Sequence, residues 1–232
     1  MSTQPVPEPE HRARWGPICG VLFVVILAVS FFITSTPNTN KSPQDILNYY
    51  TKNSHKTALG ISTVLADIAV VFGIFWFGYL RDRFGRTDVG ARFSPILLAG
   101  AIIFASGGLV FSGAQFALID QPKKMLPATA QTLNFLQSDI GVGAITIGVS
   151  ILMWAAGFII LRTRIVPVWL AWVSFVLGVV AVAGPLGFFA FLATGLWILI
   201  VAFYMWRFEA ALPVSGELVE APTANDSGVT AG

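Results

Sequence analysis

The residue of this chain that is best suited to chemistry is an acid inside an apolar segment. Asp67 lies near the middle of LGISTVLADIAVVFGIFWFGYL, residues 59–80. A carboxylate in hydrocarbon is costly, so such a residue is expected to face neighbouring helices or water. At 100° per residue, Thr63 and Asp67 share one helix face with Lys56, Gly60, Val71 and Gly78. We expect this face to pack inward and the opposite face, with Phe72 and Trp76, to contact lipid.

Two other apolar segments carry small and polar residues at the same helical spacing. In residues 94–119 these are Ala101, Gly108, Ser112 and Gln115, and in residues 139–161 they are Asp139, Gly143, Thr146, Ser150 and Gly157. Small residues let helices approach closely, and helix rise gives Ser112 and Thr146 depths similar to that of Asp67. The candidate site is therefore a polar seam that opens outward and consists of Asp67, Thr63, Ser112, Gln115, Asp139, Thr146 and Ser150.

Two interpretations of Asp67 remain open. In the first, the side chain is protonated or hydrogen-bonded to serine and threonine hydroxyls of neighbouring helices, and it fixes helix packing. In the second, the seam admits water and Asp67 binds a cation or carries a proton. An Asp67→Asn variant that is expressed normally but is inactive would favour the second interpretation.

Enzyme motifs are absent from the sequence. It contains no metal-ligand pair, nucleophile motif, P-loop or dinucleotide fingerprint. Asp67 and Asp139 differ in predicted depth by about 13 Å, which is too far for acid–base work on one bond. The single cysteine, Cys19, excludes an internal disulfide, and a net charge of +2 gives no sign of nucleic-acid binding. We expect no enzyme activity, no cofactor and no metal site.

The elements that position the seam are predicted to be membrane-spanning helices. The chain is 55% hydrophobic and 11% charged, whereas soluble domains carry about 25% charged residues. A spanning helix needs about 20 apolar residues. Six segments qualify: about 17–36, 58–80, 94–119, 139–161, 166–183 and 185–206. The last two are divided by AGPLG, residues 183–187, which predicts a turn. The predicted fold is an all-α, polytopic transmembrane bundle of six spans.

The basic residues predict an orientation for these spans. With six spans, one side holds Arg12, Arg14, Arg81, Arg83, Arg86, Arg92, Arg162, Arg164 and Arg207. The other side holds Lys41, Lys52, Lys56, Lys123 and Lys124. Basic residues favour the cytoplasmic side, so the nine arginines predict cytoplasmic termini in the inner (plasma) membrane. The first span is read as retained, because its apolar core is longer than that of a signal peptide.

The segments outside the spans are predicted to be two tails and an outer helix. Residues 1–14 and 209–232 are expected to be disordered cytoplasmic tails, because they are rich in polar residues, alanine and proline. Residues 43–53 are predicted to form a helix, with Ser42 as its N-cap, Pro43 in its first turn and Asp45 as the capping acid. This helix is expected to lie on the outer leaflet, where it covers the bundle mouth or offers a partner surface.

The loop after the second span resembles a known family signature. The segment GYLRDRFGR, residues 78–86, resembles the G-x-L-x-D-R-x-G-R loop of the major facilitator superfamily. The resemblance implies a charge relay at Asp82, Arg83, Gly85 and Arg86, beside Arg81, with Gly78 allowing close helix contact. Family members are built from two six-span halves. The resemblance therefore implies a half-size protomer that acts as a dimer.

A second resemblance covers more of the chain. The segments SPQDILNYY (42–50) and LRTRIVPVWLAW (161–172) resemble those of small six-span bacterial membrane proteins of unknown function. This resemblance implies architecture and no mechanism. The expected function is a structural, accessory or sensing component of the cell envelope, and the alternative is a small transporter or an ion- or proton-handling protein. The expected partners are the lipid bilayer and either a second copy or an unidentified membrane protein.

Overall fold

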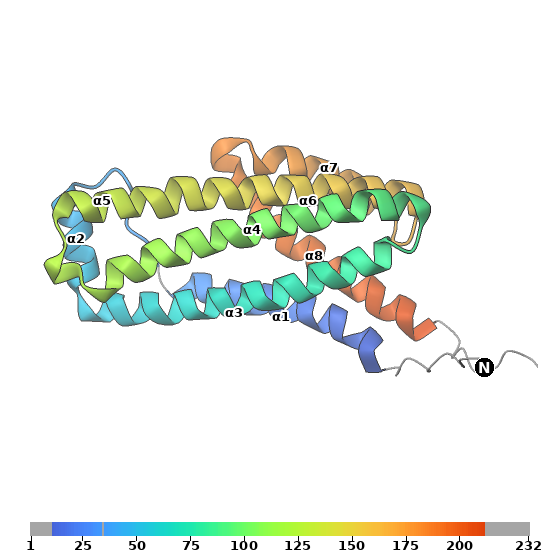
Figure 1. Cartoon of the computed structure of the whole chain (residues 1–232), viewed down its shortest axis with the longest axis horizontal. Helices are drawn as coiled ribbons and strands as arrows, with labels where there is room; N and C mark the ends of the chain where they lie inside the picture. Colours follow the sequence, from blue (N-terminus) through green and yellow to red (C-terminus); the bar gives the residue numbers. More distant parts are fainter. Residues whose placement is uncertain (1–10, 34, 212–232) are drawn as a thin grey trace, which may run out of the picture.

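The computed structural model describes residues 11–33 and 35–211, and that part of the chain is helical without strands. Its elements form one elongated bundle (Figure 1). In chain order they are α1 (His11–Ile33), α2 (Pro43–Thr51), α3 (Asn53–Phe84), α4 (Asp88–Asp120), η1 (Pro122–Lys124), α5 (Pro127–Phe135), η2 (Leu136–Gly141), α6 (Val142–Thr163), α7 (Trp169–Ala181), η3 (Gly184–Leu186) and α8 (Gly187–Ala211). Helix α1 begins earlier than predicted and α8 ends later than predicted, so residues 11–14 and 209–211 are helical. The rest of both predicted tails lies outside the described residues.

Within the described residues, five helical segments are long and apolar enough to cross a membrane. They are Trp15–Ile33, Asn53–Phe84, Asp88–Asp120, Pro127–Thr163 and Gly187–Arg207. The predicted class, an all-helical bundle with several helices that can span a membrane, is confirmed. The predicted fifth span, 166–183, is shorter than expected, because α7 has only 13 residues. At 1.5 Å per residue, α7 measures about 20 Å, against about 30 Å of hydrocarbon. The predicted turn after α7 is present, and Gly184 there adopts a φ of +60°.

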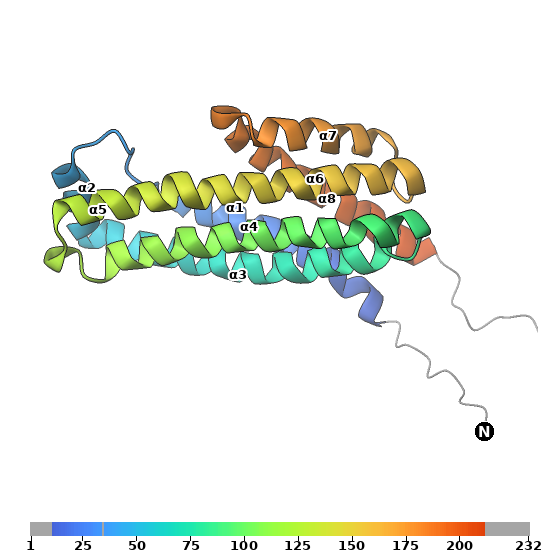
Figure 2. The same ribbon diagram turned by 45° about the horizontal axis from the view of Figure 1, so that its top comes forward.

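Three helical rods are much longer than a bilayer requires. Helix α3 has 32 residues, α4 has 33, and the continuous helix Pro127–Thr163 has 37. These rods measure about 48–55 Å. Helices α7 and α8 run beside only part of this length (Figures 1 and 2). One end of the bundle therefore extends past α7 and α8, and there it carries α2 and α5.

Basic residues occupy opposite ends of the bundle according to type. All nine arginines lie at the start of α1, around the α3–α4 turn, around the α6–α7 turn or near the end of α8, and these points meet at one end in Figure 1. All five lysines lie at the other end, near α2, the start of α3 and η1. The predicted segregation of the two residue types is therefore present in the fold.

The extended end has its own small core. Ile46, Tyr50, Leu59, Leu118 and Ala130 are buried together where α2 covers α3, α4 and α5. Helix α2 begins as predicted, because the Ser42 side chain accepts a hydrogen bond from the backbone nitrogen of Asp45. The buried Tyr50 hydroxyl donates to Asn134 Oδ1 at 3.1 Å and accepts from Gln137 Nε2 at 3.1 Å. Helix α2 thus packs onto the bundle as a cap, and it ends at Thr51 rather than at residue 53.

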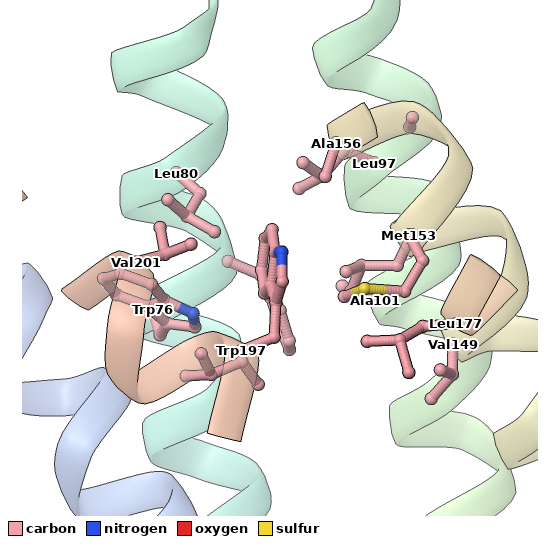
Figure 3. Packing of buried hydrophobic residues seen from close by; sticks show 14 of the residues in the cluster. Trp76, Leu80, Leu97, Ala101, Val149, Met153, Ala156, Leu177, Trp197 and Val201 are labelled. Atoms are coloured by element: carbon pink, nitrogen blue, oxygen red, sulfur yellow. The ribbon is translucent and has the colours of Figure 1, made fainter. Parts of the chain in front are cut away.

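The lipid-facing side of α3 differs from the prediction. Trp76 is fully buried, and its ring fills the space beside Gly20 of α1, where an added Cβ would lie 2.8 Å from the indole. Figure 3 shows Trp76 and Trp197 among core side chains such as Leu80 and Met153. Val71, expected inside, is 52% exposed. The exposed side of α3 is an aliphatic stripe with one phenylalanine, formed by Ile61, Val64, Ile68, Val71 and Phe75. The α3 sequence alone could not show that α1 offers glycine to the large ring.

Helices α4 and α6 are in unusually close contact. A Cβ added to Gly148 would lie 2.4 Å from the backbone nitrogen of Phe104. One added to Gly100 would lie 2.7 Å from the nitrogen of Leu152, and one added to Gly107 would lie 2.7 Å from that of Ile145. Such contacts require glycine, which is how small residues join helices in membranes. This interface fixes the position of α4, which carries Ser112 and Gln115.

Candidate functional site

A cavity of about 410 Å³ reaches Asp67. Its walls come from α1, α3, α4, α6 and the first turns of α8. Of the seven residues of the predicted seam, five line this cavity: Asp67, Thr63, Ser112, Gln115 and Thr146. The exposed residues Ser35 and Thr36, which follow α1, also line it. The cavity therefore runs from an exposed segment to a carboxylate between the helices.

Asp67 faces α4 and makes one hydrogen bond. Ser112 Oγ donates to Asp67 Oδ1 at 2.6 Å, a short distance typical of a hydroxyl that donates to a carboxylate. Across residues 11–33 and 35–211, Asp67 has no further hydrogen-bond donor and no ion-pair partner. No lysine, arginine or histidine is among the described residues that line the cavity. Among the described residues, the carboxylate is thus held by one hydroxyl and has no countercharge.

Gln115 lies one helical turn beyond Ser112 on the same face of α4. Its side chain is 2% exposed, and its Oε1 atom is buried without a hydrogen-bond partner. A buried polar atom without a partner costs about 1–3 kcal/mol. Because Gln115 also lines the cavity, this oxygen is a candidate acceptor for a donor from outside the protein.

The hydroxyl groups deep in the cavity already donate their hydrogens to carbonyl oxygens. Thr63 Oγ1 donates to Leu59 O at 2.8 Å, and Thr146 Oγ1 donates to Gly143 O at 2.9 Å. Ser62 Oγ donates to Ser30 O at 2.9 Å, and Ser30 Oγ donates to Leu27 O at 2.7 Å. These four hydroxyl groups therefore offer only lone pairs to a ligand. The Gln115 amide is the exception among the polar lining groups, since it also carries N–H donors, so this part of the cavity is rich in hydrogen-bond acceptors.

The other two residues of the predicted seam lie elsewhere. Asp139 is exposed and accepts a hydrogen bond from Ser138 Oγ at 3.2 Å. Ser150 Oγ donates to Gly178 O at 2.7 Å and so joins α6 to α7. The seam prediction assumed 100° per residue from residue 139 onward, but Leu136–Gly141 forms a π-helix. A π-helix turns less per residue than an α-helix, which moves Asp139 away from the face of Thr146.

Sequence reasoning missed two groups of lining residues. Ser30 and Ser62 join the polar wall from α1 and α3. The second group is aromatic and consists of Phe31, Phe104, Phe111, Phe188 and Phe191. The polar residues were detectable, because Ser62 precedes Thr63 and Ser30 interrupts an apolar run. The phenylalanines carried no signal, since the spans contain many of them.

A smaller apolar cavity adjoins the first. It measures about 120 Å³ and shares Leu27, Phe31, Phe104 and Phe191 with the larger one. Its remaining walls are almost entirely apolar and include Phe23. The two cavities together offer an acceptor-rich part at Asp67 and an apolar extension.

The loop that resembles the major facilitator signature does not join this site. Asp82 pairs with its neighbour Arg81 at 3.8 Å, and the two side chains are 76% and 50% exposed; such exposed pairs contribute little. Arg83 Nε donates to the Tyr79 hydroxyl at 3.4 Å. Gly85 ends α3 by donating its N–H to Arg81 O at 2.8 Å, and Arg86 is exposed.

The expected helix contact at Gly78 is wrong. No atom of a neighbouring helix in the described part of the chain lies within 4 Å of a Cβ built there. The close approach of a neighbouring helix occurs one residue later, where the Tyr79 ring packs against Gly16 of α1, 2.2 Å from a Cβ built at that glycine. The glycine that permits this contact is therefore on α1 and not on α3.

The fold and the cavity define a class: a multi-pass helical membrane protein with a partly polar internal cavity. Comparison with family models, with curated proteins and with solved structures finds no match to this chain.

Proposed function

We propose that this chain is a small solute-binding membrane protein of the transporter type, in which Asp67 is the polar anchor of the bound solute. The observation that carries the proposal is the cavity of about 410 Å³ that reaches Asp67. Ligand sites in proteins measure about 300–1,000 Å³ and combine apolar walls with a few polar groups. A purely structural aspartate needs a partner such as Ser112 but no such space, because protein interiors are otherwise closely packed.

The proposal includes an orientation and a sixth crossing. Because the arginines gather at one end of the bundle, that end is cytoplasmic and both termini lie there. Helix α7 starts at this end and α8 returns to it, so the α7–α8 hairpin forms the fifth and sixth crossings despite the short α7. Ser35 and Thr36 follow the opposite end of α1, so the solute enters from the outer side.

Thiol labelling from water tests whether solutes reach Asp67. In a Cys19→Ala background, a Thr63→Cys variant in lipid nanodiscs is treated with a charged, membrane-impermeant methanethiosulfonate. The Thr63 side chain is only 3% exposed in the structure, but it lines the cavity one turn from Asp67, so we expect labelling if solutes enter the cavity. The matched control is Ala69→Cys on the same helix, a fully buried core position that should not react. If the Thr63→Cys protein labels no faster than the Ala69→Cys protein, the cavity is closed to solutes and a structural role for Asp67 is correct.

A further inference from the structure

Building on the proposed function, we propose that the solute is an organic ammonium ion with an apolar body. Its N–H groups bind Asp67 and Gln115, and its apolar part lies among the cavity phenylalanines and extends into the smaller cavity.

The charge of the ligand follows from Asp67. Asp67 is partly withdrawn from water, where charges in proteins are normally paired, yet no basic side chain lies among the described residues of the cavity wall. The nearest lysine along α3, Lys56, donates instead to Asp120 O at 3.0 Å. A cation supplied by the ligand is therefore the complement that the site lacks.

The donor groups of the ligand follow from the acceptors around Asp67. Ser112 donates to Oδ1, and no other residue in the described part of the chain donates to Oδ2. Gln115 Oε1 is buried and unpartnered, and the Thr63 hydroxyl hydrogen is used within its own helix. An ammonium group carries N–H donors and the positive charge that these acceptors call for, whereas a carboxylate or phosphate brings further acceptors and a negative charge.

The size and walls of the cavity favour an organic ion over an inorganic one. A cavity needs only about 10–15 Å³ to hold one water molecule, so 410 Å³ far exceeds the needs of a hydronium ion or a bare metal cation. Aromatic faces attract organic cations, and five phenylalanines line the larger cavity: Phe31, Phe104, Phe111, Phe188 and Phe191. The apolar extension of about 120 Å³ gives space for a carbon chain or a ring.

The test measures protection of the Thr63→Cys thiol, in the Cys19→Ala background and in phosphatidylcholine nanodiscs. The probes are n-butylammonium, n-hexylammonium and phenethylammonium chloride. Their controls are 2-phenylethanol, which has the shape without the charge, phenylacetate, which has the opposite charge, and sodium chloride at equal ionic strength. We expect at least one ammonium probe to slow labelling tenfold or more at a concentration at which the controls change it less than twofold.

Variants then assign the effect to Asp67. Asp67→Asn keeps an acceptor for Ser112 but removes the charge, so we expect the protecting concentration of the ammonium probe to rise at least tenfold. Asp67→Glu restores the charge and should recover part of the affinity. Asp139→Asn removes an exposed carboxylate outside the cavity and should change nothing.

Several outcomes would overturn the proposal. If 2-phenylethanol protects as well as the ammonium probes, or if Asp67→Asn binds them like the parent, charge does not select the ligand. If sodium chloride alone protects, the site binds an inorganic cation. If no ammonium probe protects a thiol that labels readily, the ligand class is wrong while the solute-binding function stands. If the thiol does not label at all, both proposals fail together.

Discussion

The close contact between α4 and α6 gives a prediction that can be worked from distances. In a Gly148→Ala variant, the new methyl group would lie 2.4 Å from the Phe104 nitrogen and 2.7 Å from its Cα. Ordinary contact begins near 3.4 Å. Because both atoms belong to the backbone, no side chain can turn aside, and the two helices must separate locally by about 1 Å.

The expected magnitude combines two opposing effects. Overpacking costs about 1–3 kcal/mol, and a gap of up to 1 Å removes a quarter to a half of the dispersion energy of the contacts around it. Replacing glycine by alanine returns up to about 1 kcal/mol through helix propensity. Subtracting up to about 1 kcal/mol from about 1–3 kcal/mol leaves a loss centred on about 1–2 kcal/mol, which lowers the Tm of a chain of this size by roughly 2–8 °C.

A second glycine on α6 provides the control. No atom lies within 4 Å of a Cβ built at Gly143, so Gly143→Ala gains helix propensity without overpacking and should melt at the parent temperature or above it. The measurement is thermal unfolding in one detergent, followed by tryptophan fluorescence. Equal melting temperatures for the two variants would refute the inferred contact between α4 and α6.

Two further predictions concern the cap and the α3–α4 turn. Burial raises the pKa of the Tyr50 phenol well above its usual value near 10. Above about pH 10 the unfolded chain therefore loses the phenol proton while the folded protein keeps it. The free energy of unfolding should fall as the pH rises past about 10. Tyr50→Phe should lower the free energy of unfolding at pH 8 by about 1–3 kcal/mol, because Asn134 and Gln137 lose their hydrogen bonds to the hydroxyl. The variant should also lose less stability than the parent as the pH rises past about 10. If denaturant titrations at a series of pH values show the same loss in both proteins, Tyr50 is not its source. Thr87 Oγ1 accepts from the Gly90 nitrogen at 3.0 Å as the N-cap of α4, so Thr87→Ala should cost about 0.5–2 kcal/mol in the same titrations while Thr87→Ser costs less.

The sequence was informative where a single helix or turn determines the outcome. The apolar segments predicted all the long helices, and Gly184 predicted the turn between α7 and α8. Ser42 predicted the start of α2, because the capping hydrogen bonds are local. Within the candidate site, Asp67 and Ser112 were both named from helical spacing, and the structure joins them at 2.6 Å.

The errors arose where a neighbouring helix or an irregular turn determines the position of a side chain or the end of a helix. Trp76 was assigned to lipid because its partner, Gly20, lies on another helix. Asp139 was assigned to the seam because a π-helix leaves no clear mark in composition. The length of α7 was overestimated because apolar residues continue on both sides of it. Each of these features depends on contacts between helices or on backbone geometry, which spacing along one segment does not contain.

The short α7 has a consequence for the lipids around the protein. Beside α3 and α4 the protein presents rods longer than the bilayer, whereas α7 is shorter than the hydrocarbon by about 10 Å. Mismatch costs a fraction of a kcal/mol per Å, so in the proposed six-span arrangement the acyl chains that border α7 would be compressed while those that border α3 would not. The protein is therefore asymmetric toward its surrounding lipid, and bilayers of short-chain lipids accommodate it with less deformation than thick, sterol-rich ones.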